Sequence, residues 1–321
     1  MPRSAAALTI LPFALVLALA VEVGIAGSLA TPSSPRAVSS AHPTITEFAS
    51  APPSTAQPST AQPSTAPPAS GSNSADEMLR VHNELRVAIS VPAVRGDDRV
   101  TTAAKRHAEY LARNGAIGHD ETPGADGFTG ATVRDRLAAQ GYTDATASEV
   151  ATSFGSGTDG VRSLWILPYH RLGLMHPHAI VAGWGHAESG ARSATVGVIV
   201  YDFSSSAPDL VRSPADGQRV QASWDGDESP DVLPFGAARP VGYPVMLVAS
   251  HAKALELRSA RLTDGAGREI TYHVVPQIYE SDYAAIVPAQ PLVRGSRYHV
   301  RFELRLSGTD MTAEWDFETE P

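Results

Sequence analysis

The spacing of hydrophobic residues changes once along this chain, near residue 206, and this change most constrains the fold. Before it, apolar residues recur every three or four positions, as in residues 74–88 (SADEMLRVHNELRVA), which is the period of a helix with one buried face. After it, apolar and polar residues alternate, as in residues 298–306 (YHVRFELRL), which is typical of a half-buried strand. The chain is therefore predicted to be α+β, with helices layered against a small sheet followed by an all-β module.

Two segments precede the first predicted helix. Residues 1–30 combine Arg3, an apolar run and a small-x-small ending, Ser28-Leu29-Ala30, which together indicate a secretory signal peptide. Residues 31–74 are of low complexity and contain a Pro-Ser-Thr-Ala-Gln unit at residues 53–57 and 58–62, followed by a degraded copy, and this composition cannot bury enough apolar surface to fold. We expect a cleaved export signal, with an uncleaved anchor as the alternative, and then a disordered linker. The linker is either a stalk through the cell envelope or an inert leader.

The chain contains no cysteine, which excludes disulfides, thiolate metal sites and a lipid-modified cysteine. An exported chain of this kind must be stabilised by core packing, for which a hydrophobic content of 43 % is sufficient. Its 25 Lys and Arg against 34 Asp and Glu give a net charge of −9 without a basic run, which argues against nucleic acid as a partner. We expect a bacterial monomer, secreted or associated with the cell envelope, without a membrane span in the mature chain.

The region after the linker divides into an N-terminal module, residues 75–206, and a C-terminal module, residues 207–321. The N-terminal module is predicted to contain helices and then a strand rich in β-branched residues, over residues 74–88, 97–115, 132–141, 159–167 and 193–203. The C-terminal module is predicted to contain short strands separated by proline and glycine, including residues 243–250, 270–276, 298–308 and 312–319.

Several pieces of the N-terminal module carry a family resemblance through their order and spacing. They are LRVHNELR with Asn83 and Arg86, VTTAAKRHAEYLARNGAIGHD with His119, VRDRLAAQGY, SEVAT with Glu149, and LWILPYHRLGLMHP with Trp165, His170 and Arg171. Over about 130 residues, a domain-sized stretch, they resemble the CAP family, also called SCP or PR-1-like proteins. The resemblance implies an α-β-α sandwich. The C-terminal module, from GYPV to WDFET, resembles a bacterial immunoglobulin-like domain, which implies an all-β sandwich of that type.

The CAP resemblance implies a cavity with two histidines and two acids, which binds a divalent metal ion in some members. Carried onto this sequence, His119 and His170 are the histidines and Glu149 is one acid. The second acid usually follows the tryptophan, and no carboxylate follows Trp165 before Pro168. Two imidazoles and one carboxylate still match a three-ligand site with an open position, and nitrogen ligands favour zinc or copper over calcium.

Three functions follow from this interpretation. The first is a secreted, non-enzymatic CAP protein whose cavity binds a divalent metal, zinc or another, or a small ligand or cell-envelope component. The second is a zinc-dependent hydrolase acting on extracellular peptide or cell-wall material. It would need a base to take a proton from water, and the missing second acid argues against it. The third is lipid or sterol binding, a theme of the family. The sequence assigns no catalytic residue.

Each candidate ligand also has a structural alternative. His119 could cap the preceding helix, His170 could make a structural hydrogen bond, and Glu149 could tie a loop to backbone amides.

Other histidines and acids are expected to have simpler roles. His176 and His178 are predicted to be surface loop residues, and His186 is predicted to line the cavity mouth at a strand end. A packing role is predicted for His82 and His107 on their helices, and the acidic run of residues 225–231 is predicted to be a solvated loop.

Overall fold

A computed structural model describes residues 73–250 and 254–321 of the chain. The predicted export signal and nearly all of the predicted linker, residues 31–72, lie outside these described residues. The residues that are described fall in one compact unit. Within them, no helix combines the length and the apolar character needed to cross a membrane.

Local capping signals mark the start of helices α1 and α2 and the end of α2 in the N-terminal module. Ser74 precedes α1 and its hydroxyl accepts a hydrogen bond from the Glu77 amide at 3.2 Å. Asp97 caps α2 in the same way, and Gly115, at φ 62°, ends α2 in the left-handed conformation. The helices are α1 (Ala75–Ala88), α2 (Asp98–Asn114), α3 (Val133–Ala139), α4 (Gly157–Ile166) and α5 (Pro168–Met175).

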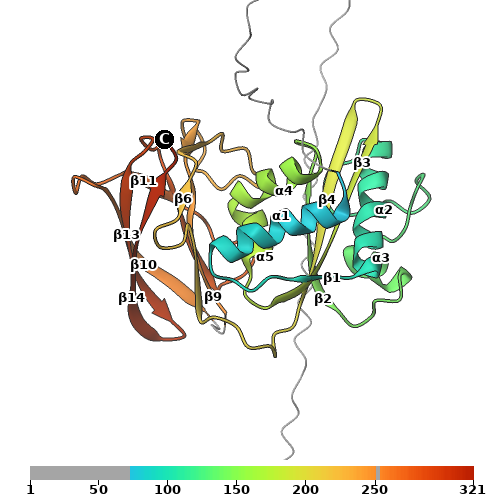
Figure 1. Cartoon of the computed structure of the whole chain (residues 1–321), viewed down its shortest axis with the longest axis horizontal. Helices are drawn as coiled ribbons and strands as arrows, with labels where there is room; N and C mark the ends of the chain where they lie inside the picture. The colour runs from blue at the N-terminus through green and yellow to red at the C-terminus, as the bar shows by residue number, and fades with distance from the viewer. Residues whose placement is uncertain (1–72, 251–253) are drawn as a thin grey trace, which may run out of the picture. The chain divides into compact units, whose positions relative to one another are not determined.

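A four-stranded sheet lies between these helices. Its strands follow the order β1-β3-β4-β2, in which β1 and β3 are parallel and the other neighbours are antiparallel. Helix α2 covers one face of the sheet, whereas α1, α4 and α5 cover the other (Figure 1). The mixed α+β class is therefore confirmed, with helices on both sides of the sheet. The strands are β1 (Arg95–Gly96), β2 (Thr146–Thr152), β3 (Ala179–Ser189) and β4 (Arg192–Tyr201).

Helix α2 sits directly on β3 because two glycines of the AGWG segment leave room for its backbone. A Cβ atom at Gly183 would lie 2.3 Å from the Thr101 amide nitrogen, and one at Gly185 would lie 2.3 Å from the Lys105 Cα. Trp184, between them, points to the opposite face of the sheet and is only 1 % exposed. The segment therefore supplies a flat surface to one layer and a large core side chain to the other.

Among the described residues of the C-terminal module, all the regular elements are strands. Two four-stranded sheets, ordered β10-β13-β14-β6 and β11-β12-β9-β5, share a common buried core, and β7 pairs with β8. The predicted alternation over residues 298–306 is confirmed on β13. The all-β class of this module is observed, and its immunoglobulin type stays a prediction. The strands are β5 (Leu210–Ser213), β6 (Arg219–Val220), β7 (Ser223–Trp224), β8 (Val241–Gly242), β9 (Val245–Ala249), β10 (Leu255–Asp264), β11 (Tyr272–Val274), β12 (Tyr283–Pro288), β13 (Arg297–Leu306) and β14 (Thr309–Thr319).

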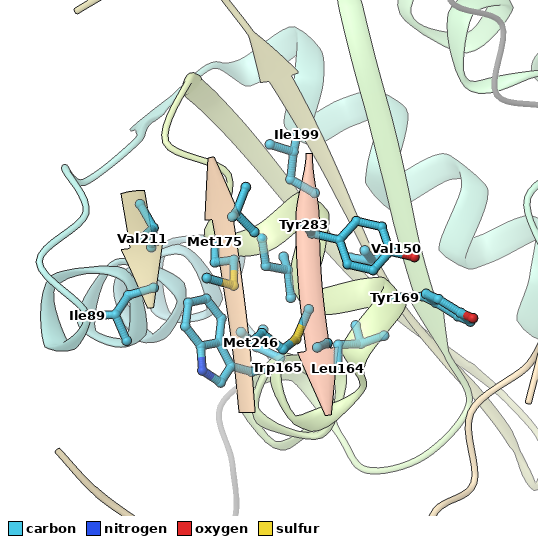
Figure 2. Packing of buried hydrophobic residues seen from close by; sticks show 14 of the residues in the cluster. Ile89, Val150, Leu164, Trp165, Tyr169, Met175, Ile199, Val211, Met246 and Tyr283 are labelled. Carbon is cyan, nitrogen blue, oxygen red and sulfur yellow. The ribbon is translucent and has the colours of Figure 1, made fainter. Parts of the chain in front are cut away.

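Strands β9 and β12 are buried on both faces. Alternate residues of β9, such as Leu247, point into the core between the two sheets. The others, including Met246, belong to a second cluster that also contains Tyr283 of β12 and Leu164 and Trp165 of α4. Figure 2 shows the Met246 side chain beside Leu164 and Trp165 of α4, whereas the Tyr283 ring lies beside Val150 of β2. The two modules therefore share one continuous hydrophobic core.

Candidate functional site

Glu149 lies on β2 and brings together side chains from three other segments. Its carboxylate is 2 % exposed and accepts a hydrogen bond from Arg136 Nη2 at 2.7 Å. The Nδ1 atom of His119 lies 3.2 Å from Glu149 Oε1, and Nε2 of His107 lies 3.3 Å from the same oxygen. The structure thus pairs two of the predicted site residues, His119 and Glu149.

Beneath this pair lies a buried charge cluster. His107 places Nδ1 2.9 Å from Glu121 Oε1 and Nε2 3.3 Å from Glu149 Oε1, so both ring nitrogens face carboxylates. Arg136 contacts both acids, with Nε 3.9 Å from Glu121 Oε1 and Nη2 2.7 Å from Glu149 Oε2. The packing role predicted for His107 is confirmed by its full burial, but its contacts with two buried acids were missed.

The electrostatics of Glu149 make it a poor proton acceptor. Burial alone would raise its pKa, but the hydrogen bond from His119 and the charges of His107 and Arg136 outweigh burial, so the pKa is lowered. A carboxylate with a lowered pKa stays ionised and takes up a proton weakly, whereas a general base works best with a pKa near the working pH.

His119 sits at the solvent edge of this cluster, with half of its side chain exposed. The carboxylate can only accept, so Nδ1 donates to Glu149 and Nε2 carries the lone pair of the neutral ring. Arg136 also donates to the His119 carbonyl at 2.9 Å, which fixes the loop backbone. In place of the helix cap considered above, the structure shows a histidine oriented by a carboxylate.

His170, the third predicted site residue, contacts a different acid. On α5, its Nδ1 lies 2.8 Å from Glu228 Oε1, and its backbone amide donates to the same oxygen at 3.0 Å. Glu228 belongs to the segment between β7 and β8, and its side chain is fully buried. The prediction of a solvated loop over residues 225–231 is therefore wrong at Glu228, because that side chain turns inward onto α5 of the other module.

The predicted three-ligand set is therefore divided between two histidine–carboxylate pairs. Among the residues that the structure describes, no group of three or more His, Asp or Glu side chains is arranged to hold a metal ion. The pairs nevertheless share one geometry, since His119 and His170 each direct Nδ1 at a buried carboxylate. A histidine that binds a metal is usually oriented in this way through its other nitrogen. The metal site stays a prediction.

The surface positions predicted for His176 and His178 are wrong. His178 is fully buried, and the side chain of His176 is 12 % exposed. The ring of His176 packs edge-on against Tyr201 and Phe203, with centroid distances of 5.3 and 5.5 Å. Its Nε2 atom also lies 3.6 Å from Asp282 in the C-terminal module. The loop is buried because side chains from both modules pack around it.

His186 has contacts that resemble those of a catalytic triad. Its Nδ1 lies 2.8 Å from Thr195 Oγ1 and accepts from the Gly157 amide at 3.3 Å, while Nε2 lies 3.2 Å from Glu188 Oε1. A nucleophile must be reachable by its substrate, but Thr195 is fully buried. A Cβ at Gly160 would lie 2.7 Å from its hydroxyl oxygen, so α4 covers it. This cluster ties β3 to the start of α4. The contacts of His186 therefore do not place it at a cavity mouth, where it was predicted to lie.

A hollow of about 440 Å³ lies elsewhere in the N-terminal module, lined by residues including Arg99, Tyr142, Asp144, Ile180 and Tyr201. His119, Glu149 and His170 do not line it. The predicted cavity thus does not coincide with this hollow.

Comparison with known proteins assigns the N-terminal module. Residues 79–201 match the model of the CAP family, described as the Cysteine-rich secretory protein family. Residues 79–201 form a CAP domain. No curated protein matches the chain.

Solved structures also match parts of the chain, at low sequence identity and low TM-score. An outer surface protein from Borrelia burgdorferi is 18 % identical with a TM-score of 0.34, over 39 % of this chain and 90 % of that one. An extracellular protein containing an SCP domain from Bacillus anthracis is 18 % identical with a TM-score of 0.34, over 40 % of each chain. A cysteine-rich secretory protein from Staphylococcus aureus is 13 % identical with a TM-score of 0.30, over 42 % of this chain and 40 % of that one.

Two motif residues on α1 organise the backbone of the CAP domain. The side-chain amide of Asn83 makes two hydrogen bonds with the backbone of Val94. Its Nδ2 donates to the Val94 carbonyl at 2.9 Å, and its Oδ1 accepts from the Val94 amide at 2.8 Å. Arg86 is fully buried and donates to the carbonyls of Pro92, at 2.9 Å, and Leu174, at 2.6 Å. These contacts hold the segment after α1 and the end of α5 against the helix, so the motif residues Asn83 and Arg86 are structural.

The motif arginine on α5 connects the CAP domain to the C-terminal module. Arg171 is fully buried and donates to the carbonyls of Trp165 and Ile166 within its own domain. It also donates to Ser213 Oγ at 3.2 Å and to the Pro244 carbonyl at 3.0 Å. Helix α5 therefore carries a predicted site residue, His170, beside the residue that fixes the module boundary.

Proposed function

We propose that the chain is an exported, non-enzymatic binding protein, in which His119 and His170 of the CAP domain, each within its own histidine–carboxylate pair, offer a nitrogen to a divalent metal ion or a small ligand. The observation that carries this proposal is the shared geometry of the two histidines. Each directs Nδ1 at a buried carboxylate, at 3.2 Å for Glu149 and 2.8 Å for Glu228. The carboxylates leave Nε2 of each ring as the atom that offers a lone pair to a metal or a hydrogen-bond donor.

Binding without catalysis is favoured by the state of the nearby acids. Glu149 has a lowered pKa and is engaged by Arg136 and His119, so it is a poor base for activating water. Glu228 is occupied by His170. A hydrolase of the predicted kind would need one of these acids to exchange protons near neutral pH.

The location of the proposed activity is outside the cytoplasm. The signal pattern at residues 1–30 supports export, and a cell-envelope component is then an available ligand. We propose that the linker and the C-terminal module carry the CAP domain within or beyond the envelope.

Zinc titration by calorimetry on the full chain tests the proposal. Wild type is expected to bind zinc, and His119→Ala and His170→Ala are each expected to remove the binding at their own pair, because each removes the ligand nitrogen there. His299→Ala is the matched control, since His299 directs Nδ1 at Asp316 at 2.8 Å on the exposed side of the C-terminal module.

Two results would overturn the proposal in different ways. Wild type that shows no heat of zinc binding and no metal on elemental analysis removes the metal assignment. Cleavage of a peptide library by wild type, abolished by a chelator and by His119→Ala, removes the non-enzymatic assignment and supports the hydrolase.

A further inference from the structure

We propose that Arg212 and Trp315 form a carboxylate-binding site in the C-terminal module. Arg212 lies on β5 and Trp315 lies on β14, in the opposite sheet. The guanidinium carbon of Arg212 lies 5.5 Å from the centroid of the Trp315 ring. Both side chains carry a buried hydrogen-bond donor that has no acceptor among the residues the structure describes. The site is in a different module from His119 and His170, so its test is independent of the proposed function.

The strand pattern explains why Arg212 faces the core between the two sheets. Side chains alternate between the faces of a strand. Val211 packs in the core shared with the CAP domain, whereas Leu210 packs against the core of the two sheets. Arg212 lies two positions after Leu210 and therefore shares its face. Because β5 is the last strand of its sheet, the half-buried Arg212 can lay its stem on the core and extend its guanidinium toward solvent.

Arg212 differs from the other arginines that are withdrawn from solvent. Arg86, Arg136 and Arg171 are fully buried, and each donates to carbonyl or carboxylate oxygens. Arg212 is half-buried, yet within the described chain its Nε has no acceptor and no acid forms an ion pair with it. A cation withdrawn from water without a partner is costly. The missing partner is therefore an oxygen acceptor with a negative charge.

Trp315 supplies a second unpaired donor beside the first. Its side chain is only 4 % exposed, and its Nε1 has no partner among the residues described. A buried indole N–H normally has an acceptor. The ring is fixed by Phe302, whose ring meets it edge-on at a centroid distance of 5.4 Å. The fixed ring then holds the guanidinium of Arg212 over it through a cation–π contact, which orders the cation before any ligand arrives.

The outer edge of the guanidinium is the part that a ligand can reach. Nε of Arg212 is buried without a partner, whereas its terminal nitrogens, Nη1 and Nη2, are not among the buried unpaired atoms of the described chain. They therefore keep contact with solvent. The planar guanidinium presents donors in a fork that matches the two oxygens of a carboxylate. A carboxylate can bind there without any opening of the core.

The charges around the site favour an anion with a single charge. Asp216 accepts a hydrogen bond from the backbone amide of Asp316 at 3.0 Å. Asp316, next to Trp315 in the chain, forms ion pairs with Arg297 and His299. Neither acid pairs with Arg212, but both add negative charge near it. A carboxylate carries one charge, whereas phosphate carries more than one near neutral pH and would be repelled more strongly.

The indole N–H signals of the full chain, labelled with nitrogen-15, test the site by NMR. The chain has four tryptophans, and Trp315→Phe identifies the signal of Trp315 by its loss. Sodium acetate is expected to shift this signal with saturation in the millimolar range, because a ligand of so few atoms binds weakly. Sodium chloride at the same ionic strength is expected to leave it in place. The absence of a saturable acetate shift would overturn the proposal, and tighter binding of sodium phosphate would overturn the assignment to a carboxylate.

Arg212→Met separates a binding role from a structural role. Methionine keeps an unbranched stem for packing but removes the cation. The acetate shift of Trp315 is expected to disappear, while the urea midpoint without acetate is expected to stay unchanged or to rise, because a half-buried cation without an acid is removed. Arg297→Met, at an exposed arginine paired with Asp316, is the matched control and is expected to keep the acetate shift. A clearly lower midpoint in Arg212→Met, or a folded variant that still responds to acetate, would show that the proposal is wrong.

A second ligand distinguishes the sources of the carboxylate. A short peptide with both ends blocked and a single glutamate is titrated in the same way as acetate. Tighter binding of the peptide than of acetate supports an acidic protein segment as the natural ligand, whereas binding of acetate alone supports a small organic acid. If neither ligand shifts the Trp315 signal, Arg212 is not a carboxylate site.

Discussion

Arg171 holds its guanidinium carbon 4.6 Å from the ring centroid of Tyr243, across the boundary between the CAP domain and the C-terminal module. The same guanidinium donates to the Pro244 carbonyl, next to that ring, and to carbonyls of its own domain. A planar group with donors on several sides can satisfy these acceptors at once, which a lysine ammonium cannot do. One side chain thus fixes the relative position of α5 and the start of β9.

Arg171→Lys is expected to lower the free energy of unfolding by at least about 3 kcal/mol, because two or more buried acceptors lose their donors. Urea denaturation measures this loss. Arg80→Lys, at an exposed arginine paired with Glu77 and Glu84, is the control and is expected to leave stability unchanged. Equal effects of the two substitutions would show that Arg171 does not hold the modules together.

Glu149 and His119 are expected to differ in their effects on stability. Glu149→Ala leaves Arg136 buried without its closest carboxylate and is expected to cost about 3–5 kcal/mol. His119→Ala removes a half-exposed partner and is expected to stay within about 1 kcal/mol of wild type. Chemical denaturation of both variants distinguishes a structural acid from a ligand histidine. A large loss of stability in His119→Ala would contradict the assignment of Glu149 as the structural residue and His119 as the ligand residue.

Gly185→Ala is expected to destabilise the CAP domain by about 3 kcal/mol, because the new methyl group meets the α2 backbone at 2.3 Å. Backbone atoms of a helix cannot move aside as a flexible side chain can. Gly265→Ala is a suitable comparison, since its nearest neighbour, the Arg297 carbonyl, lies at 3.7 Å. Thermal unfolding of both variants should show a large shift for the first and little shift for the second.

His82 is expected to make the protein sensitive to mild acid. Burial lowers its pKa from 6.5 to about 3, and the charge of Arg86 adds to this, against the opposing hydrogen bond to the Leu174 carbonyl. Between these pH values the unfolded chain binds a proton that the folded chain excludes, so stability falls as pH falls and is fully present above 6.5. The loss from neutral pH to about pH 4.5 is expected to be about 3 kcal/mol.

The contribution of His82 is isolated by His82→Gln, which does not titrate and can still bond to the Leu174 carbonyl. Urea denaturation at several pH values should show a shallower pH dependence for the variant than for wild type. Parallel profiles would mean that His82 does not exclude its proton in the folded state.

Local signals predicted helices α1 to α4, whereas α5 was not predicted. Ser74, Asp97 and Gly115 act within one turn of their own helices, so their roles can be read from neighbouring residues alone. The strand alternation of β13 is equally local, because one of its faces meets solvent and the other the core. The pairing of His119 with Glu149 came from the family pattern, which carries long-range information that spacing alone does not contain.

The errors at His178 and Glu228 share one cause, which is that each is buried by contacts formed far away along the chain. His170, which Glu228 contacts, lies 58 residues before it. The continuous apolar run VMLVA, Val245–Ala249, was a usable signal, because a strand that is apolar on both faces needs a cover on each. Interpreted in that way, β9 predicts a second layer against the sheet, although it does not say that α4 and α5 supply it.

The burial of β9 on both faces limits how this chain can recombine with others. A gene fusion that joins the CAP domain, at residue 206, to a different C-terminal module would remove Met246 from the core around Trp165 and Glu228 from its contact with His170. The transplanted CAP domain would then expose an apolar helix face to water and lose the acid that orients its histidine. The two modules of this chain are therefore expected to depend on each other for their structure, so that neither can be exchanged between proteins without the other.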